Sequence, residues 1–339
     1  MNQALGGLFP AILAAMLVVL LSSPLLIRAF SRLGLVDIPG SAPHKRHATV
    51  TSLAGGPVLA LAVGLTHPLL QLPVDRLVQG ILLGGVGMLA SGMIDDRFNL
   101  RPRTKIIGQI GAAVIALAFG IQVHITQNPW IDLPLTLLWM VGLINAFNFV
   151  DSMDGLALGL ASIALAFFVL ATLDAGQPAL AALAAAILGG TLGLYFYNAT
   201  PARLFLGDSG AQLLGFALAA IGIAYVPAGA GLPQGVSWFT PILVLGVPIF
   251  DTTLVVASRL RKRRPVYQAR SDHTYHRLVA MGMHPSRSVL AMQLAAILLA
   301  LAAFIALDLS VLLANLVFGL ILVCGVIAMG VLERAPIEA

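Results

Sequence analysis

Eleven apolar runs, each close to the length of a membrane-spanning helix, recur along the chain and restrict its fold more than any other feature. A helix needs about 20 mainly apolar residues to cross a bilayer. The composition agrees, because 59% of the residues are hydrophobic and only 10% are charged, against about 25% charged in soluble domains. We therefore expect an all-α polytopic membrane protein with about eleven transmembrane helices, forming one integral membrane domain over residues 1–339. The runs are Leu8–Phe30, Leu53–Leu72, Leu77–Ile94, Ile106–Ile125, Ile131–Val150, Leu156–Leu173, Ala179–Tyr197, Ala211–Val226, Trp238–Ser258, Val289–Leu307 and Val311–Leu332.

Basic residues gather on one side of this pattern. Of 19 Lys and Arg residues, only Arg76 falls in the short loops that follow the second, fourth, sixth, eighth and tenth runs. Because cytoplasmic loops carry the excess of Lys and Arg, we expect the N-terminus outside and the C-terminus in the cytoplasm of a plasma or inner-membrane protein. The same bias explains the pI of 9.8 and indicates contact with anionic membrane lipids and phosphates, with no nucleic-acid partner. The cytoplasmic loops expected to carry the functional site lie near 31–52, 95–105, 148–155, 198–210 and 259–287.

The stretch Asn145–Gly159, which reads NAFNFVDSMDGLALG, places polar residues where a membrane helix should end. Asn145, Asn148, Asp151 and Asp154 are spaced by three residues, so on a helix they would lie near one face. Amides and carboxylates at a bilayer edge are costly, which favours a functional role. The alternative is a loop whose Asn and Asp side chains cap free helix ends.

Asp95 and Asp96 are adjacent carboxylates that end the third apolar run. Neighbouring negative charges repel, so at least one of the two is expected to need a cation. That cation is either a divalent metal or a basic neighbour among Arg97, Arg101 and Arg103.

A third acidic motif, Gly207-Asp208-Ser209-Gly210, opens the eighth run. Its glycines allow a backbone to approach a phosphate at a helix N-terminus, and Asp208 could hold a metal there. An ordinary Asp N-cap is the alternative.

The ninth run and the loop after it add acidic, imidazole and guanidinium groups. Asp251 lies eight residues before Arg259, about 12 Å into a helix, where a carboxylate faces the protein interior or bonds to a neighbouring Thr. Further on, Asp272, His273, His276 and Arg277 suit the binding of a diphosphate.

Acidic, amide and basic groups on one membrane face are typical of a Mg²⁺-dependent phosphoryl-transfer site, and Mn²⁺ could serve the same purpose. Its position at the cytoplasmic edge suggests one soluble nucleotide substrate and one lipid phosphate. A secondary transporter is the rival hypothesis, and it predicts acidic residues near the midplane and an inverted repeat.

Five ordered motifs carry a resemblance to a known family. The chain resembles the polyprenyl-phosphate N-acetylhexosamine-1-phosphate transferases, the family of MraY, WecA and TagO, from Gly34 to about Gly282. The motifs are LGLVDIPG with HKRH and GG, DDRFNLRPRTKIIGQ, NAFNFVDSMDGLALG, NATPARLFLGDSGAQLLGF, and PIFDTTLVVASR with DHTYHRL.

The resemblance implies a reaction and roles for particular residues. UDP-sugar and polyprenyl (undecaprenyl) phosphate would give polyprenyl-diphospho-sugar and UMP, as the first membrane step of an envelope glycan such as lipopolysaccharide or teichoic acid. The family's catalytic acids fall on Asp95, Asp96 and Asp208, with Asp95 favoured over Asp96 for the lipid phosphate and Asp208 as the metal ligand, which Asp151 would assist. The residues matching substrate-binding positions are Lys45, Asn148, Asp151, Asp154, Phe205, His273, His276 and Arg277.

One departure from the family pattern concerns the histidine loop. Tyr275 stands where the family usually has a middle His, and Asp272 directly precedes His273. This departure favours a UDP-N-acetylglucosamine enzyme of the WecA/TagO branch over an MraY-type phospho-N-acetylmuramoyl-pentapeptide transferase. The oligomeric state, monomer or homodimer, stays open.

Overall fold

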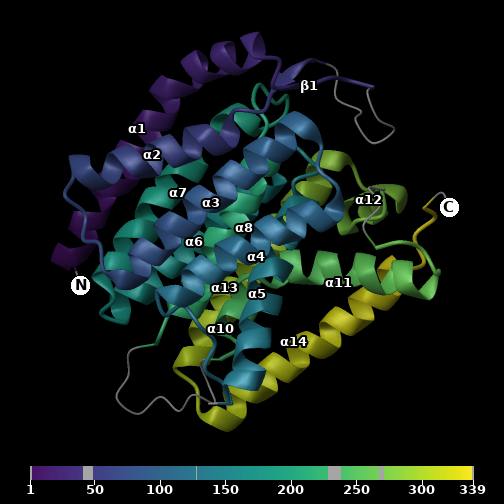
Figure 1. Cartoon of the computed structure of the whole chain (residues 1–339). Helices are drawn as coiled ribbons and strands as arrows, with labels where there is room; N and C mark the ends of the chain where they lie inside the picture. Colours follow the sequence, from purple (N-terminus) through teal and green to yellow (C-terminus); the bar gives the residue numbers. More distant parts are fainter. Residues whose placement is uncertain (1, 41–48, 127, 228–237, 267–270, 338–339) are drawn as a thin grey trace. The chain divides into compact units, whose positions relative to one another are not determined.

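The computed structural model describes residues 2–40, 49–126, 128–227, 238–266 and 271–337 (Figure 1). These residues are mostly helical, as expected. The chain divides into two compact units, one of residues 1–41 and 45–228 and one of residues 42–44 and 229–339. Each unit is described by itself, and the single domain expected over residues 1–339 stays a prediction.

The first unit contains eight helices and a two-residue antiparallel strand pair among its described residues. Its elements are α1 (Asn2–Arg32), β1 (Val36–Asp37), β2 (Thr51–Ser52), α2 (Gly55–Leu69), α3 (Arg76–Phe98), α4 (Pro102–Ala118), α5 (Pro129–Val150), α6 (Leu156–Asp174), α7 (Pro178–Asn198) and α8 (Gly207–Ala224). The second unit contains α10 (Thr240–Val244), α11 (Gly246–Arg261), α12 (Thr274–Ala280), α13 (Pro285–Leu307) and α14 (Val311–Leu332).

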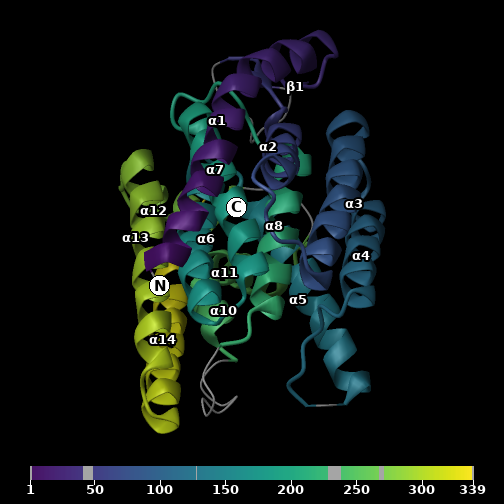
Figure 2. The same ribbon diagram turned by 90° about the vertical axis from the view of Figure 1, so that its left-hand side faces the viewer.

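Helices α6, α7 and α8 form the centre of the first unit (Figure 2). They are mainly apolar and mostly buried, because α1 and α2 pack on α7 while α3 and α5 pack on α8. Small residues make the contacts close, as expected for helices that pack without a hydrophobic driving force. A Cβ added at Gly92 of α3 would lie 2.4 Å from Ser209 Cα of α8, and one added at Gly56 would lie 2.6 Å from Gly210 N.

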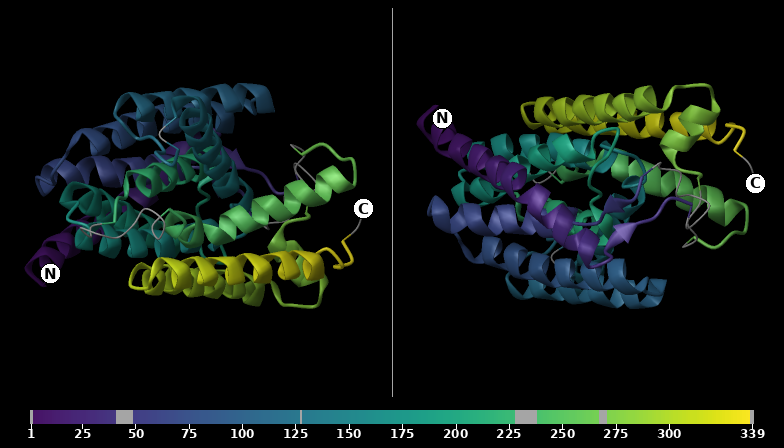
Figure 3. Two further views of the ribbon diagram at one scale, coloured as in Figure 1. Left: turned by 90° about the horizontal axis from the view of Figure 1, so that it is seen from below. Right: turned by 90° about the horizontal axis from the view of Figure 1, so that it is seen from above.

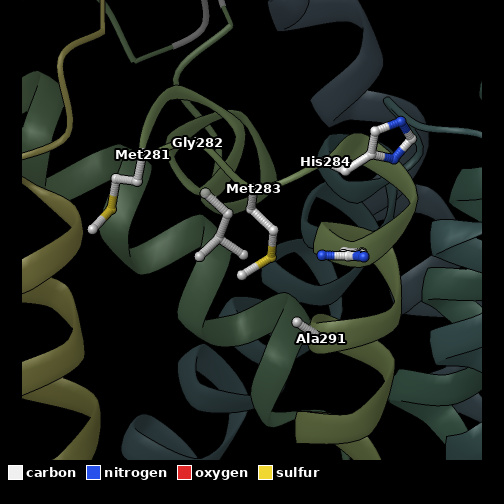
Figure 4. Close-up of a pocket in the computed structure, with 7 residues that line it drawn as sticks. Met281, Gly282, Met283, His284 and Ala291 are labelled. Atoms are coloured by element: carbon white, nitrogen blue, oxygen red, sulfur yellow. The ribbon is translucent and has the colours of Figure 1, made fainter.

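In the second unit, α13 and α14 run side by side (Figure 3). Both are long apolar helices with little buried surface, which suits helices that face lipid. A cavity of about 480 Å³ opens beside the start of α13 (Figure 4). Met283 and Ala291 contribute apolar surface to it, and His284 and Arg287 contribute polar groups. The cavity borders the expected active-site loop 259–287, but none of the individually predicted site residues is among those that line it.

Eight described helices are long and apolar enough to cross a membrane, and they match eight of the eleven expected runs. The chain is therefore a multi-pass membrane protein. The other three runs form shorter helices: α2 has 15 residues, α4 has 17, and the run Trp238–Ser258 is divided at Leu245 into α10 and α11. The span count of eleven and the orientation of the termini stay predictions.

Candidate active site

Asp95 is buried in the last turn of α3 and is paired with Lys105. Its Oδ2 lies 2.5 Å from Lys105 Nζ, and its Oδ1 accepts a hydrogen bond of 2.9 Å from the backbone N of Leu100. The link after α3 is short because Asn99 adopts a left-handed conformation and Pro102 already opens α4. The basic partner of Asp95 is therefore Lys105, ten residues further on, and not one of the three arginines named as candidates.

Asp96 has different partners. Its two carboxylate oxygens accept hydrogen bonds from the backbone N of Asp208 at 2.7 Å and of Ser209 at 3.1 Å. These amides open α8, where a helix has unsatisfied N–H groups and a positive dipole end. Gly207 has a φ of +68°, and a Cβ there would lie 2.8 Å from Asp96 Oδ2. Asp96 is thus a cap for α8 that comes from another helix.

Asp208 lies between side chains of three helices. Its Oδ1 accepts hydrogen bonds from Asn148 Nδ2 of α5 at 2.6 Å and from Gln212 Nε2 of α8 at 3.3 Å. Its Oδ2 lies 3.4 Å from Lys105 Nζ of α4. The Asp208 side chain is still 26% exposed, so the carboxylate remains accessible to a ligand.

The central stretch is not one continuous helix. Helix α5 ends at Val150, and a turn over residues 151–155 leads into α6. Asn145 and Asn148 therefore share a helix face, whereas Asp151 and Asp154 lie in the turn, so the shared face covers only two of the four residues, and the helix ends at Val150 like the expected run Ile131–Val150. Gly155 reverses the chain direction with a φ of +74°, a conformation that glycine adopts without steric cost.

The turn is fastened to the loop that precedes α8. Asp154 Oδ2 accepts a hydrogen bond of 3.2 Å from the backbone N of Ala202. The buried Asn198 accepts from Gly155 N and donates to Leu204 O, both at 2.9 Å. These contacts hold the turn carrying Asp151 against the loop that leads to Asp208.

Asp151 is half-buried near three other carboxylates. Burial raises the pKa of the Asp151 carboxyl well above its ordinary value, and the charges of Asp208, Asp96 and Asp154 raise it further. A cation beside Asp151 and Asp208 would relieve this repulsion.

The donor set fits a magnesium ion that shares its ligands with a substrate. Among the described residues, no group of three or more His, Cys, Asp or Glu is arranged to hold a metal by itself. Mg²⁺ commonly takes only one or two protein carboxylates, together with water and substrate phosphates. Asp208 and Asp151 could supply those carboxylates.

Two further expected residues belong to the first unit. Lys45 lies outside the described residues. Phe205 is half-buried in the loop before α8, where its backbone N donates to Ser52 O at 2.9 Å and its O accepts from Gly55 N at 3.1 Å. This pairing ties the Phe205 loop to the chain that enters α2.

The histidine loop, residues 272–277, belongs to the second unit and is held by hydrogen bonds to α11. The buried Asp251 accepts hydrogen bonds from Thr274 N at 2.6 Å and from His273 Nδ1 at 2.8 Å. Thus Asp251 faces the protein interior as expected, but its partners lie in the loop and not among its neighbouring threonines. Tyr275, at the departure from the family pattern, contacts His276, with its hydroxyl 2.5 Å from Nε2.

Two arginines fasten the same loop. Arg259 makes a two-pronged ion pair with Asp272, with bonds of 3.0 and 2.7 Å, and Arg277 Nε donates to Asp272 O at 2.9 Å. Burial opposes the charge of Asp272, but the hydrogen bond and charge of Arg259 outweigh it and lower the pKa of that carboxyl. Arg277 is itself buried, so in this unit it supports the loop.

Comparison with known proteins relates this chain to one family of enzymes. The family model described as glycosyl transferase family 4 matches residues 78–226. The probable undecaprenyl-phosphate N-acetylglucosaminyl 1-phosphate transferase of Bacillus subtilis is 31% identical over 309 residues, which are 87% of this chain and 84% of that protein.

The chain belongs to the polyprenyl-phosphate N-acetylhexosamine-1-phosphate transferase family. Other members of this enzyme family show similar coverage. The decaprenyl-phosphate N-acetylglucosaminephosphotransferase of Mycobacterium tuberculosis is 31% identical over 77% of this chain and 72% of its own length. The undecaprenyl-phosphate alpha-N-acetylglucosaminyl 1-phosphate transferase of Escherichia coli is 25% identical over 79% and 76%. Like them, this chain is an enzyme that transfers a sugar-1-phosphate.

Three residues of the transferase site were not among those expected to act. Lys105 follows Asp95 by ten residues, enough for the end of one helix, a short turn and the first turn of the next helix. Its return toward Asp95 could therefore have been predicted from the sequence. Gln212 follows Asp208 by four residues and so shares its helix face. Asn198 ends α7, and only its bond to Leu204 O, six residues further on, is local, whereas its bond from Gly155 N comes from a distant turn.

Proposed function

We propose that this chain transfers N-acetylglucosamine-1-phosphate from UDP-N-acetylglucosamine to undecaprenyl phosphate, with release of UMP. The observation that carries the proposal is the cluster of Asp95, Lys105, Asn148 and Asp208, which joins four helices of a membrane protein. The relatives named above act on undecaprenyl or decaprenyl phosphate and N-acetylglucosamine, by their names.

In the proposed reaction, an oxygen of the lipid phosphate forms a bond to the sugar-bearing phosphorus of the donor. The bond between that phosphorus and the bridging oxygen breaks, and UMP leaves with the electron pair. Asp208 and Asp151 would hold Mg²⁺, which neutralises diphosphate charge when bound. The Lys105 ammonium, beside both Asp95 and Asp208, would attract a substrate phosphate.

The members of the Asp95–Asp96 pair then have separate tasks. Asp95, bound to Lys105, is the member we assign to the lipid phosphate. Both oxygens of Asp96 are occupied by the amides that open α8, so this carboxylate orients Asp208. Asn148, Asp154 and Phe205 are proposed to border the nucleotide, and for the second unit, binding of a phosphate group by His273, His276 and Arg277 stays a prediction.

We further propose eleven spans, an outside N-terminus and an active site on the cytoplasmic face. The support is the bias of Lys and Arg to one set of loops. The clustered residues lie at the ends of the helices around those loops, which suits a soluble nucleotide meeting a lipid phosphate. A transporter would instead hold its acidic residues near the midplane.

The test is release of UMP by the purified protein supplied with Mg²⁺, undecaprenyl phosphate and UDP-N-acetylglucosamine. A parallel reaction with UDP-N-acetylmuramoyl-pentapeptide distinguishes the MraY-type alternative. Asp208→Asn should reduce release by about 100-fold or more, the size typical of removing one electrostatic contact from a transition state. Absence of UMP with every UDP-sugar would refute the proposal, and full activity of Asp208→Asn would refute the metal assignment.

A further inference from the structure

A reciprocal amide pair joins α4 to α5 inside the first unit. Asn145 Nδ2 donates to Gln109 Oε1 at 2.7 Å, and Gln109 Nε2 donates to Asn145 Oδ1 at 3.3 Å. Gln109 is only 1% exposed, and Asn145 is half-buried. Burying polar side chains in spanning helices costs free energy even when they form hydrogen bonds with each other. Two buried amides at this position therefore indicate a functional role.

The position of this pair relates it to Asp208. Gln109 follows Lys105 by four residues on α4, and Asn145 precedes Asn148 by three residues on α5. Each member therefore lies one helical turn from a side chain that contacts Asp208, on nearly the same face. The amide pair is one turn deeper in the bundle than the Lys105 and Asn148 contacts.

The geometry of Asp208 depends on the separation of these two helices. Lys105 reaches one carboxylate oxygen from α4 at 3.4 Å, and Asn148 reaches the other from α5 at 2.6 Å. Helix α4 otherwise packs chiefly on α3. If α4 moved away from α5, Lys105 could remain with Asp95 but would lose Asp208.

We infer that Gln109 and Asn145 are positioning residues, whose amide pair sets the α4–α5 separation so that Lys105 and Asn148 hold Asp208 together. The sequence motifs contain both residues but assign a particular role to neither, and neither contacts Asp208 directly. The inference rests on the proposed transfer reaction, because that reaction reports the geometry of Asp208.

A swap of the two amides provides the test. Gln109→Asn shortens the side chain on α4 by one methylene, and Asn145→Gln lengthens the side chain on α5 by one. Each single variant keeps an amide but moves it out of position for the two hydrogen bonds. The double variant restores the summed length. We expect each single variant to lower kcat/KM for UMP release about tenfold, and the swap to return within about threefold of the parent. Single variants within twofold of the parent, or a swap as impaired as the product of the singles, would overturn the inference.

Thr191→Val is the matched control. Thr191 of α7 accepts a hydrogen bond of 2.9 Å from Ser162 of α6, which is another side-chain bond between helices of this unit but not part of the cluster. This variant should keep kcat/KM within twofold of the parent at a comparable loss of Tm. A fall in its kcat/KM equal to that of the single amide variants would show that general loosening, not positioning, lowers the rate.

Two provisions keep the outcome decisive. If a single variant does not yield folded protein, Gln109→Met replaces it, because this change keeps the side-chain length and adds no charge, while it removes both amide hydrogen bonds to Asn145. The Tm of all variants is measured as well, and the swap should regain the Tm that the singles lose. A parent that releases no UMP refutes the proposed function, and the amide pair is then judged on this thermal comparison alone.

Discussion

At the scale of single residues, the Lys105 ammonium offsets the negative charges of two carboxylates in the first unit, those of Asp95 and Asp208. It pairs with Asp95, whose side chain is 1% exposed, and lies near Asp208, which is partly open. An isolated buried charge costs far more than a paired one. Lys105 therefore stabilises the fold through Asp95 and prepares the site through Asp208.

Removal of the Lys105 ammonium should separate its effect on stability, through Asp95, from its effect on transfer, through Asp208. In Lys105→Met, the Asp95 carboxylate is left buried without its cation, at a cost of about 3–5 kcal/mol. We expect a Tm several degrees lower and no measurable transfer. Adding Asp95→Asn should restore much of the lost Tm without restoring transfer, as thermal unfolding and UMP release would show. A double variant that unfolds below Lys105→Met would contradict this account.

At the scale of elements, the contact between α3 and α8 places the acidic residues of the two helices together. Gly92 lies one turn before Asp95 and Asp96, against the backbone of Ser209. The helices can approach this closely because neither side has bulk at the crossing. That approach is what allows Asp96 to reach the amides that open α8.

Gly92→Ala should therefore damage both packing and activity. Its Cβ would lie 2.4 Å from Ser209 Cα, which is backbone and cannot rotate away. We expect a lower Tm and at least a tenfold loss of transfer. Gly87→Ala on the same helix is the control, because its Cβ would make an ordinary 3.6 Å contact with Ile115. Equal behaviour of the two variants would show that this crossing is not tight.

The Asp272–Arg259 pair predicts how the second unit responds to acid. The pKa of Asp272 is lowered in the folded protein, so its ionised form favours folding above the ordinary value of about 3.9. That stabilisation is lost as the pH falls through about 4 and below. Asp272→Asn should thus lower Tm clearly at pH 7, and its difference from the parent should shrink in acid.

The exposed Asp308 supplies the control for this experiment. Asp308→Asn lies at the far end of α13 and should change Tm little at any pH. A Tm difference for Asp272→Asn that is constant from pH 7 to pH 3 would show that ionisation of Asp272 does not stabilise the unit.

At the scale of the whole molecule, charge distribution and helix order predict which loops face the cytoplasm. With the native cysteine removed by Cys324→Ser, the variants Asp174→Cys and Asp308→Cys should react with an impermeant maleimide in intact cells. Arg101→Cys and Arg287→Cys should react only after permeabilisation, because their loops carry the positive charge. These four positions sample both units. The reverse labelling pattern would invert the proposed orientation.

Much of this protein could be predicted from local patterns. Apolar runs of spanning length indicate helices because a bilayer leaves backbone groups no other way to be satisfied. Polar residues at the ends of those runs stand out for the same reason, and so Asp95, Asn148 and Asp208 were found as site candidates. The family motifs added the reaction that such a site performs.

The tertiary structure decided which of these groups touch. The sequence shows Asp95 and Asp96 only as adjacent carboxylates, and the structure gives them different partners: Asp95 pairs with Lys105, and Asp96 accepts hydrogen bonds from the amides that open α8. Likewise, the regular spacing from Asn145 to Asp154 suggested one helix face, but α5 ends at Val150. The contacts of Lys105 with Asp208 and of Asn198 with Gly155 depend on how distant segments pack together. Local periodicity determines where a helix can form, whereas contacts between helices depend on packing that no single segment contains.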